Sequence, residues 1–495
     1  MSREERLGKD ETPMLDQNVA REVLQEAVRT GGDFAEIFME DRIDHVMGMR
    51  SHKLESATTS RTHGAGVRVF SGTNAIYAYT NDTSREGLMN CARQAAAAVR
   101  GGKGCVVAPF KPWDASRPEE ILLLPTDVKA ALKAEKLRAA EAAARSISPE
   151  IVQVMANYGD HVQDVCICNT EGVFVTDRRV QTRLRVSAIA SNGTENQSGS
   201  DAPGASMGFE LFDTRVNAEE SGKIAAQQAV TMLHAPVCPA GVMPVAIDNG
   251  FGGVIFHEAC GHSLEATSVG IGVSEFCGKL GQQIASPIVT AIDDGTLVNN
   301  WGQIHVDDEG TPSQRTVLIE NGILKSYMVD RLGSRRMNHP ITGSSRRESY
   351  AYAPTSRMRS TFIAPGNDSN EEIIASMGDG LYARKMGGGS VNPATGEFNF
   401  SVAEAYLVRD GKIAHPVRGA SLIGRGSEIL MKIDRVGKEL ELSQGMCGSK
   451  SGSVPTDVGQ PMIRVSSITV TVSPCSSGRM LTMFVPLATR PPSGI

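Results

Sequence analysis

The sequence contains no long apolar run and no signal peptide, and these two absences exclude whole classes of protein. About 18 consecutive apolar residues are needed to cross a bilayer as a helix, and no such run occurs, so we expect no membrane span. The first residues, MSREERLGKDETPMLD, are charged and have no apolar centre. They are therefore not expected to direct secretion.

Strong positive charge and paired cysteine motifs are also missing. The formal net charge is −6, so we expect no partner among nucleic acids or acidic membranes. The sequence has an odd number of cysteines, nine, and no C-x-x-C motif, which disfavours a thiol-based redox enzyme. Because no secretion signal is expected, the odd number of cysteines indicates a reducing compartment rather than a disulfide framework. We therefore expect a cytoplasmic protein.

The residues that are present are typical of a large globular protein. Of the 495 residues, 40% are apolar and 21% charged, while 51 glycines favour many turns and strands. Apolar periodicity predicts helices over 18–29, 84–98, 126–147 and 217–233. Period-two patterns and short apolar runs predict strands, among them 34–40, 45–56, 66–72, 75–81, 315–322, 323–329, 429–437 and 462–472.

These elements predict an α+β protein, with N-terminal α/β domains followed by a large β-rich C-terminal domain that carries a metal-binding helix. Four prolines between residues 108 and 125 indicate a linker. The predicted parts are an N-terminal α/β domain (1–107), a Pro-rich linker (108–125), a middle α/β domain (126–237) and the β-rich domain (238–495).

The run HEACGH, residues 257–262, has the composition of a hydrolytic metal site. Two imidazoles can hold zinc, and a neighbouring carboxylate can take a proton from the water that the metal activates. The familiar zinc helix places its histidines four residues apart, whereas His257 and His262 are five apart. Five residues of an ideal α-helix rotate by about 500°, which leaves the two side chains roughly 140° apart.

A π-bulge would realign positions five apart, because it widens the turn, and such bulges collect at functional sites. Gly261 lies within the run and would ease the distortion. We therefore predict a locally irregular helix around Cys260 and Gly261. The six residues alone leave an alternative open, which is an ordinary helix whose histidines are surface or capping residues.

A catalytic zinc site commonly has three protein ligands and leaves the fourth place to water. Candidates for the third ligand are Cys260, Cys277, Cys447, His305 and the acids of DDEG at 307–310. Cys260 should face away if the two histidines converge. Cys447 lies in GMCGSKSGS, which we expect to be a glycine-flanked loop that can approach a metal closely. From the residues alone, a buried free cysteine is an equal alternative for Cys447.

Ordered blocks along most of the chain resemble the TldD/PmbA family of zinc peptidases, and specifically its TldD-type subunit. The blocks are GAGVRVFSG, AYTND, FHEACGHSLEA, ASPIVTAIDDGTL, DDEGTPSQRTVLIENGILKSYMVDR, SSRRESYAYAPTSRM, EFNFSVAEAYLVRDGKIAHPVRGASLIG and GMCGSKSG. The resemblance implies that His257, His262 and Cys447 hold one Zn²⁺ per active subunit, and that Glu258 is the catalytic residue. Inactive partner subunits of the family lack the HExxxH pattern, which this chain keeps.

We therefore predict a zinc metallopeptidase that hydrolyses short or unfolded polypeptides. A β-rich domain can bind an extended peptide as an added strand at an exposed edge. The resemblance also implies a cleft enclosed by a dimer, formed with a related inactive subunit or with a second copy. The competing interpretation is a non-catalytic, peptide-binding or regulatory subunit with a structural zinc, and Glu258 beside the first histidine argues against it.

Two further segments carry weaker predictions. Arg346, Arg347, Tyr350 and Tyr352 could line the site or hold a peptide carboxylate, while surface arginines and packed tyrosines are the simpler alternative. The run MGGGSVNPATG (386–396) lacks the GK[ST] ending of a phosphate loop, so we expect a flexible loop there. We expect the tail that follows residue 473 to be peripheral.

Overall fold

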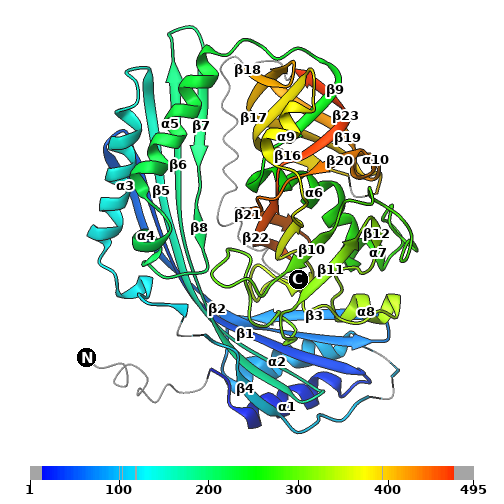
Figure 1. Cartoon of the computed structure of the whole chain (residues 1–495). Coiled ribbons are helices and arrows are strands. Elements are labelled where there is room, and N and C mark those ends of the chain that lie inside the picture. The colour runs from blue at the N-terminus through cyan, green and yellow to red at the C-terminus, as the bar shows by residue number, and fades with distance from the viewer. Residues whose placement is uncertain (1–13, 100, 103, 118–119, 393, 473–495) are drawn as a thin grey trace.

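A computed structural model of the chain describes residues 14–99, 101–102, 104–117, 120–392 and 394–472. The first half of the chain forms a long curved sheet with helices, and the second half forms a β-rich domain that packs against it (Figure 1). The expectation of an α+β fold with a β-rich C-terminal domain is confirmed. Residues 1–13 of the charged N-terminal segment and the tail that we expected to be peripheral lie outside the described residues.

The long sheet has the strand order β3-β2-β1-β5-β6-β4, and β7 and β8 also pair with β6. Its strands are β1 Phe34–Arg50, β2 Lys53–Ser71, β3 Asn74–Thr80, β4 Lys111–Asp114, β5 Ile151–Asn169, β6 Val173–Ser191, β7 Asn196–Asp201 and β8 Gly204–Ala205. The four central strands are 17 to 19 residues long. These strands are therefore long enough to run through both of the predicted N-terminal domains, 1–107 and 126–237.

Helices cover the two ends of this sheet (Figure 1). They are α1 Gln17–Val28 and α2 Arg85–Ala97 at one end, and α3 Ala130–Arg145, α4 Leu211–Thr214 and α5 Ala218–His234 at the other. Each end has its own apolar core, and each core takes side chains from both predicted ranges: Cys166 joins the first and Met47 the second. The division at 1–107 and 126–237 stays a prediction about units that could fold alone.

The Pro-rich stretch 108–125 is not purely a linker. It contains β4, which pairs parallel with β6 at the edge of the long sheet. A 3₁₀ turn, η3 Pro125–Asp127, then leads to α3. Because proline cannot donate a backbone hydrogen bond, the strand at this position lies at the sheet edge, as expected for a strand that contains Pro112.

The first hairpin differs from its prediction. We expected one strand over 45–56, but β1 ends at Arg50 and β2 begins at Lys53. Ser51 and His52 between them both have positive φ, 45° and 68°, although neither is Gly or Asn. The backbone N–H of His52 donates to the carboxylate of Glu141 on α3 (2.7 Å). A hydrogen bond to a residue far along the chain therefore stabilises a turn that the local sequence does not indicate.

The C-terminal half contains a six-stranded sheet in the order β12-β11-β10-β15-β22-β21. Its strands are β10 Ala291–Asp294, β11 Arg315–Glu320, β12 Ile323–Leu324, β15 Ser360–Ile363, β21 Glu441–Ser449 and β22 Gly452–Gln460. β13 Ser345–Arg346 and β14 Thr355–Ser356 form a separate two-stranded sheet that does not pair with the six-stranded sheet. β21 is the last strand in the order, so one of its edges carries no neighbouring strand among the described residues.

The seven-stranded sheet has the order β16-β9-β23-β19-β17-β18, with β20 beside β23. Its strands are β9 Gly241–Ile247, β16 Gly380–Val391, β17 Glu397–Arg409, β18 Lys412–Val417, β19 Ala420–Arg425, β20 Ile433–Val436 and β23 Ile463–Val472. Because β16 also pairs with β17, five of these strands close into a ring. A single large apolar core joins the ring, the six-stranded sheet and the segment 254–266 between them.

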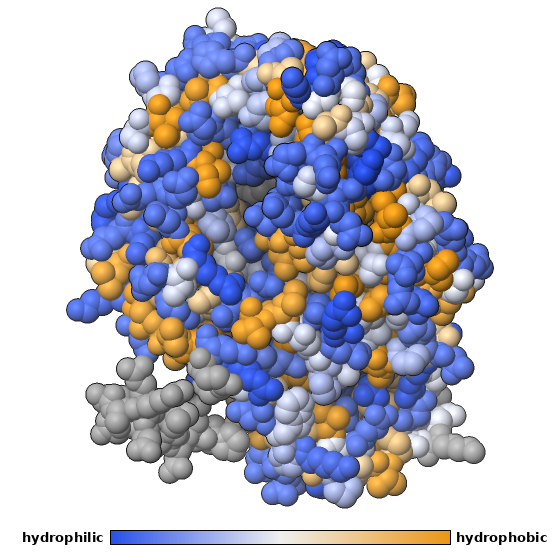
Figure 2. Space-filling view, viewed as in Figure 1, coloured by the Kyte–Doolittle hydropathy of each residue, from blue (hydrophilic) through white to orange (hydrophobic). Residues whose placement is uncertain are grey.

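Short helices complete this half of the chain: α6 Val254–Phe256, α7 Ala266–Val269, α8 Arg331–Met337, α9 Asn370–Ala375 and α10 Gly426–Met431. No helix within the described residues combines the length and apolar character needed to cross a bilayer. On the face shown in Figure 2, apolar side chains are dispersed in small groups among hydrophilic ones.

Three predicted segments of the C-terminal half need correction. The range 429–437 begins inside α10, and only Ile433–Val436 is a strand, while 323–329 contains only the two-residue strand β12. The glycine run expected to be a flexible loop belongs mostly to β16, which ends at Val391. Gly389 is suited to this strand because a Cβ there would lie 2.1 Å from the ring of Phe400 on β17.

Candidate metal centre

The HEACGH run is an irregular helical turn, as the spacing of its histidines predicts. After the 3₁₀ turn η4 Gly250–Gly253 and α6, residues His257–Gly261 form a π-helical turn, η5, and His262–Leu264 a 3₁₀ turn, η6. The rings of His257 and His262 lie 5.1 Å apart between centroids and are nearly perpendicular, at 86°. The widened turn therefore places both imidazoles on one side, which a regular α-helix would not do.

Gly261 serves this turn through close packing rather than through unusual backbone angles. Its φ and ψ are both −53°, which any residue can adopt in a helix. A Cβ at this position would lie 2.2 Å from the Sδ atom of Met358. The neighbouring Gly253 packs in the same way, with a Cβ position 2.4 Å from the backbone of Gly459 on β22. The two glycines therefore let the segment 253–261 pack closely against Met358 and β22.

Cys447 approaches this turn from β21, almost two hundred residues later in the chain. We expected a glycine-flanked loop, but Cys447 lies within the strand, two residues before the turn of the β21–β22 hairpin. Its Sγ is 3.3 Å from Nε2 of His257 and 3.3 Å from Nε2 of His262. All three donor atoms lie within 4.8 Å of one another, and they form the group of potential metal ligands found within the described residues.

Two of the three donors are buried, His262 is half-buried, and the three are electrostatically matched. Cys447 and His257 are 4% and 3% exposed. Burial alone would raise the pKa of the Cys447 thiol, but the facing imidazoles of His257 and His262 outweigh it and hold that pKa well below its usual range. Burial likewise opposes charge on His262, but the carboxylate of Glu265 and the Cys447 sulfur raise its pKa above the ordinary value. The site therefore favours the anionic form of the sulfur, which is the metal-binding form.

The donor set fits zinc. Zn–N bonds of about 2.0–2.1 Å and Zn–S bonds of about 2.3 Å in a tetrahedral arrangement place neighbouring donors roughly 3.5 Å apart. The observed separations of 3.3 Å between sulfur and each Nε2 agree with this value. A thiolate with two imidazoles also favours zinc over magnesium or calcium, which take oxygen ligands. These three residues could thus hold a zinc ion with one place left open.

Glu258 lies at the mouth of this group. Its carboxylate Oε2 is 3.8 Å from Nε2 of His262, and its side chain is 24% exposed. It is therefore both near the proposed metal position and accessible to solvent, which a residue that exchanges protons with water requires.

A cleft of about 290 Å³ opens beside His262. Its lining includes His262, Glu265, Ile271, Val273, Ser449 and Lys450. Ile271 and Val273 are each 49% exposed, and Lys450 is exposed at the tip of the β21–β22 hairpin. The cleft therefore combines apolar surface with one cationic side chain next to the metal ligands.

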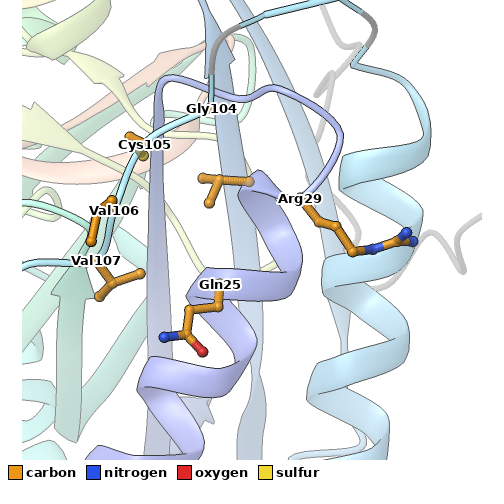
Figure 3. A pocket seen from close by; sticks show the side chains of 7 residues that line it. Gln25, Arg29, Gly104, Cys105, Val106 and Val107 are labelled. Carbon is orange, nitrogen blue, oxygen red and sulfur yellow. The ribbon is translucent and has the colours of Figure 1, made fainter.

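A larger hollow of about 440 Å³ lies elsewhere, between α1 and the segment 104–107 (Figure 3). Figure 3 shows Gln25 on α1, Arg29 directly after its end, and Cys105 to Val107 on the facing segment. Its described lining contains one thiol, Cys105, whose pKa is raised by burial, and no histidine or carboxylate. This hollow lacks the residue types for the chemistry of the metal centre.

The other candidate metal ligands have different partners. Cys260 is completely buried in the core behind the turn, where burial raises its pKa, as expected if it faces away from the histidines. Cys277 lies near the carbonyl oxygen of Val269 (3.6 Å). His305 contacts two carboxylates, those of Asp177 (2.9 Å) and Glu120 (3.3 Å).

The acids of the DDEG segment take part in the contact between the C-terminal domain and the long sheet. Asp308 pairs with Arg179 of β6 (2.7 Å), and Glu309 pairs with Arg68 of β2. Asp307 accepts from backbone N–H groups of its own loop. These carboxylates are therefore occupied in structural contacts.

The four residues predicted to bind substrate lie in the same contact region. Arg346 and Arg347 are buried, so the alternative of surface arginines does not hold. Arg346 donates to the carbonyl of Met358 (3.0 Å), and Arg347 donates to that of Asp308 (2.9 Å). The backbone N–H of Tyr350 donates to Glu40 (2.6 Å), and Tyr352 is 38% exposed. A role in substrate binding stays a prediction for all four.

Two residues near the metal centre were missed from the sequence. Glu265 lies three residues after His262, and its Oε2 is 3.2 Å from Nδ1 of that histidine. Arg357 donates through Nη2 to the carbonyl of Cys447. The spacing of Glu265 from His262 was a visible signal, since residues three apart on a helical turn are neighbours. Arg357 had no local signal.

Family comparison gives a consistent result along the chain. Domain 1 of the PmbA/TldA metallopeptidases matches residues 35–99, their central domain matches 123–233 and their C-terminal domain matches 240–472. The three matches follow one another in order, and the last includes the histidine turn and Cys447.

Individual proteins agree with this result. The chain is 37% identical to the Metalloprotease TldD homolog of Haemophilus influenzae, over 88% of this chain and 92% of that protein. It is 27% identical to the Zinc metalloprotease TldD homolog of Saccharolobus solfataricus, over 66% and 72%. Its fold is similar to that of TldE from Thermococcus kodakarensis, with a TM-score of 0.74 and 18% identity over 92% and 100%.

Proposed function

The chain belongs to the PmbA/TldA metallopeptidase family, and from that premise we propose that it is a zinc-dependent peptidase acting on short or unfolded polypeptides. The observation that carries the proposal is the convergence of His257, His262 and Cys447 beside Glu258. Two imidazoles, a thiolate and an adjacent accessible carboxylate together supply what metal-assisted hydrolysis needs.

Three of these residues would bind the metal ion, and the fourth would transfer protons. His257, His262 and Cys447 would hold the ion through Nε2, Nε2 and Sγ, the atoms that face one another. Bound zinc would polarise the scissile carbonyl and acidify a water molecule. The carboxylate of Glu258 would accept a proton from that water and pass it to the leaving amine. Because its side chain is partly exposed, Glu258 can exchange protons with solvent between turnovers.

The position of Cys447 on an edge strand supports an extended substrate. β21 has no strand on its outer edge among the described residues, and Met446 and Gly448 on either side of Cys447 are exposed. A peptide added along this edge would be bound through its backbone, and its scissile bond would lie next to the metal ligands. The cleft lined by Ile271 and Lys450 would receive a side chain of the same peptide.

A non-catalytic subunit with a structural zinc is not favoured. A structural zinc site usually has four protein ligands, whereas the described residues bring together three. Glu258 beside His257 has no purpose in such a site. The donor set alone would permit metal storage or regulation, but the accessible carboxylate favours hydrolysis.

The protein's partner and compartment follow from weaker observations. Because the fold is similar to that of TldE, we propose a dimer formed with a related subunit or with a second copy of this chain. All eight cysteines in the described part of the chain are free, which is expected in a reducing compartment, and we propose the cytoplasm.

The test compares E258Q with the wild-type protein in a digest of fluorescence-quenched peptides, alongside metal analysis of both proteins. We expect E258Q to keep its zinc and to lose activity by about 10²- to 10⁴-fold, since it removes only the proton acceptor. A matched control is E428Q, because Glu428 is exposed on α10, which packs beside the π-helical turn. Zinc-loaded E258Q that cleaves as fast as E428Q would exclude the proposed role of Glu258.

A further inference from the structure

Glu265 and Arg357 form a buried pair of opposite charges directly beneath the metal ligands. The side chains of Glu265 and Arg357 are 3% and 0% exposed, and Oε1 of the former lies 3.9 Å from Nε of the latter. These two atoms have no hydrogen-bond partner within the described residues. Because an isolated buried charge is costly, the attraction between the two groups offsets part of the cost of burying each of them.

The carboxylate of this pair fixes the orientation of one metal ligand. Oε2 of Glu265 lies 3.2 Å from Nδ1 of His262, so the carboxylate accepts from Nδ1–H and leaves Nε2 to face the metal position. Nε2 faces Cys447, whose sulfur is 3.3 Å away. A carboxylate at this position thus selects the tautomer that can bind a metal.

The backbone around Glu265 is held on both sides. The N–H of Ala266 donates to the carbonyl of Met328 (2.8 Å), and the N–H of Met328 donates to the carbonyl of Leu264 (3.0 Å). Glu265, which directly follows the irregular turn, therefore forms an isolated parallel β-bridge with Met328. Its carboxylate is presented to His262 from a fixed backbone.

The guanidinium of Arg357 holds the hairpin that carries the sulfur. Nη2 donates to the carbonyl of Cys447, and Nη1 donates to the carbonyl of Gly452 and to Oγ of Ser451, both at 2.9 Å. One planar group thus contacts the strand of Cys447 and the turn that follows it. A lysine could not reproduce this forked arrangement.

We propose that Glu265 and Arg357 are positioning residues that join the two separate parts of the metal centre. Glu265 orients His262, Arg357 orients Cys447, and their mutual attraction couples the histidine turn to the β21–β22 hairpin. This inference rests on the metal binding proposed above, but it does not depend on peptide hydrolysis. It assigns to the pair an effect on metal affinity and coordination geometry.

The test measures metal binding by full-length, metal-free wild-type protein and the variants E265A, E265Q and R357K. Zinc affinity is measured by competition with a chromophoric chelator, and the Co²⁺-loaded proteins are compared by absorption spectroscopy. We expect E265A to bind zinc about 10- to 100-fold more weakly, as for other residues that orient metal ligands. E265Q should lose less, because its amide oxygen still accepts from Nδ1–H.

The cobalt spectrum separates positioning from a general loss of structure. In E265A the ligand-field bands should change, because His262 is no longer oriented, while the sulfur-to-cobalt charge-transfer band remains. In R357K the charge-transfer band should weaken, because the hairpin carrying Cys447 is held less firmly. Thermal unfolding of the metal-free variants identifies any that fail to fold, and E265Q keeps the comparison usable if E265A is one of them.

The matched control is E404Q, which alters another buried carboxylate of the same domain, one that pairs with Arg384 (2.7 Å) and lies outside the group of metal donors. It should bind zinc like the wild type. Wild-type affinity and spectrum in both Glu265 variants would overturn the proposal, as would equal losses in E404Q, or wild-type protein that binds neither Zn²⁺ nor Co²⁺. Tight zinc binding without peptide cleavage would instead refute the proposed function and leave this inference standing.

Discussion

The long sheet and the metal centre both bury polar side chains, but they satisfy them in different ways. Where the C-terminal domain meets the sheet, Arg68 contacts Glu36 (2.8 Å) and Glu309, and all three side chains are at most 2% exposed. Each charge there already faces an opposite charge. At the metal centre, the sulfur of Cys447 and two imidazole nitrogens face one another and lie within 4.8 Å of one another.

This difference separates a contact that stabilises the fold from a site that is arranged for a ligand. Arg68 has its charge matched by carboxylates, and their attraction raises its pKa despite burial. The metal centre gains most when a cation occupies it, since all three donors are electron-rich. Disruption of the first region should therefore change stability, whereas disruption of the second should change metal affinity.

The largest expected effect is the loss of stability on replacing Arg68. The variant R68M leaves the buried carboxylate of Glu309 without its guanidinium, and removal of one partner of a buried ion pair costs about 3–5 kcal/mol. Denaturant unfolding of the zinc-loaded protein measures this change. The zinc content per folded molecule should stay that of the wild type.

The control for R68M lies on the same strand. Arg61 pairs with Asp41, but its side chain is 62% exposed, so R61M should change the free energy of unfolding very little. Equal destabilisation by R61M and R68M would contradict the distinction between exposed and buried pairs. Loss of zinc from folded R68M would contradict the separation of the two regions.

The next effect in size concerns the metal centre itself. In the variant C447S, a neutral hydroxyl replaces the thiolate, and we expect zinc affinity to fall about 100-fold or more. C447S also removes the attraction between the thiolate and the facing imidazoles, so metal-free C447S should unfold at a somewhat lower denaturant concentration than the metal-free wild type, with a smaller loss than in R68M. Chelator competition and denaturant unfolding measure the two quantities.

C277S provides the comparison for this variant. The Cys277 thiol lies near the carbonyl of Val269 and outside the group of metal donors, so its replacement should leave zinc affinity unchanged. If C447S retained wild-type affinity while C277S lost it, the assignment of the sulfur ligand would be wrong.

The histidine turn could be predicted from the sequence because its geometry is local. An interval of five residues between His257 and His262 excludes a shared metal on a regular α-helix and requires a widened turn. The turn observed over His257–Gly261 confirms this prediction. The helix that Ser84 caps, α2, was predictable for the same reason, since its cap residue and apolar face lie within one short segment.

Residues that depend on distant contacts could not be predicted in this way. Cys447 was indicated by family resemblance, while its own flanking glycines suggested a loop rather than the observed strand. Arg346 was a candidate for substrate binding, with a surface position as the alternative, and Arg357 carried no prediction. Both donate to carbonyl groups that lie far along the chain. Side-chain periodicity carries no information about such partners.

The smallest effect that we predict concerns the turn at Ser51 and His52, which the sequence did not indicate. Both residues have positive φ, a combination that Asn-Gly adopts with less strain. The variant S51N/H52G should therefore raise the free energy of unfolding by about 0.5–1 kcal/mol. It should do so without changing zinc affinity, because the turn lies at the long sheet and contacts α3 through the backbone of residue 52.

A substitution with the opposite expected effect, in the β2–β3 hairpin, tests whether backbone strain explains the prediction for the first hairpin. Gly72 has a φ of 61° and no atom within 4 Å of its Cβ position, so G72A adds backbone strain without a steric clash. We expect it to lower the free energy of unfolding by about 1 kcal/mol. Opposite changes from the two hairpins, measured by denaturant unfolding, would assign the effect to backbone conformation. If S51N/H52G were instead destabilising, the contacts of His52 with Glu141 would outweigh the strain at this turn.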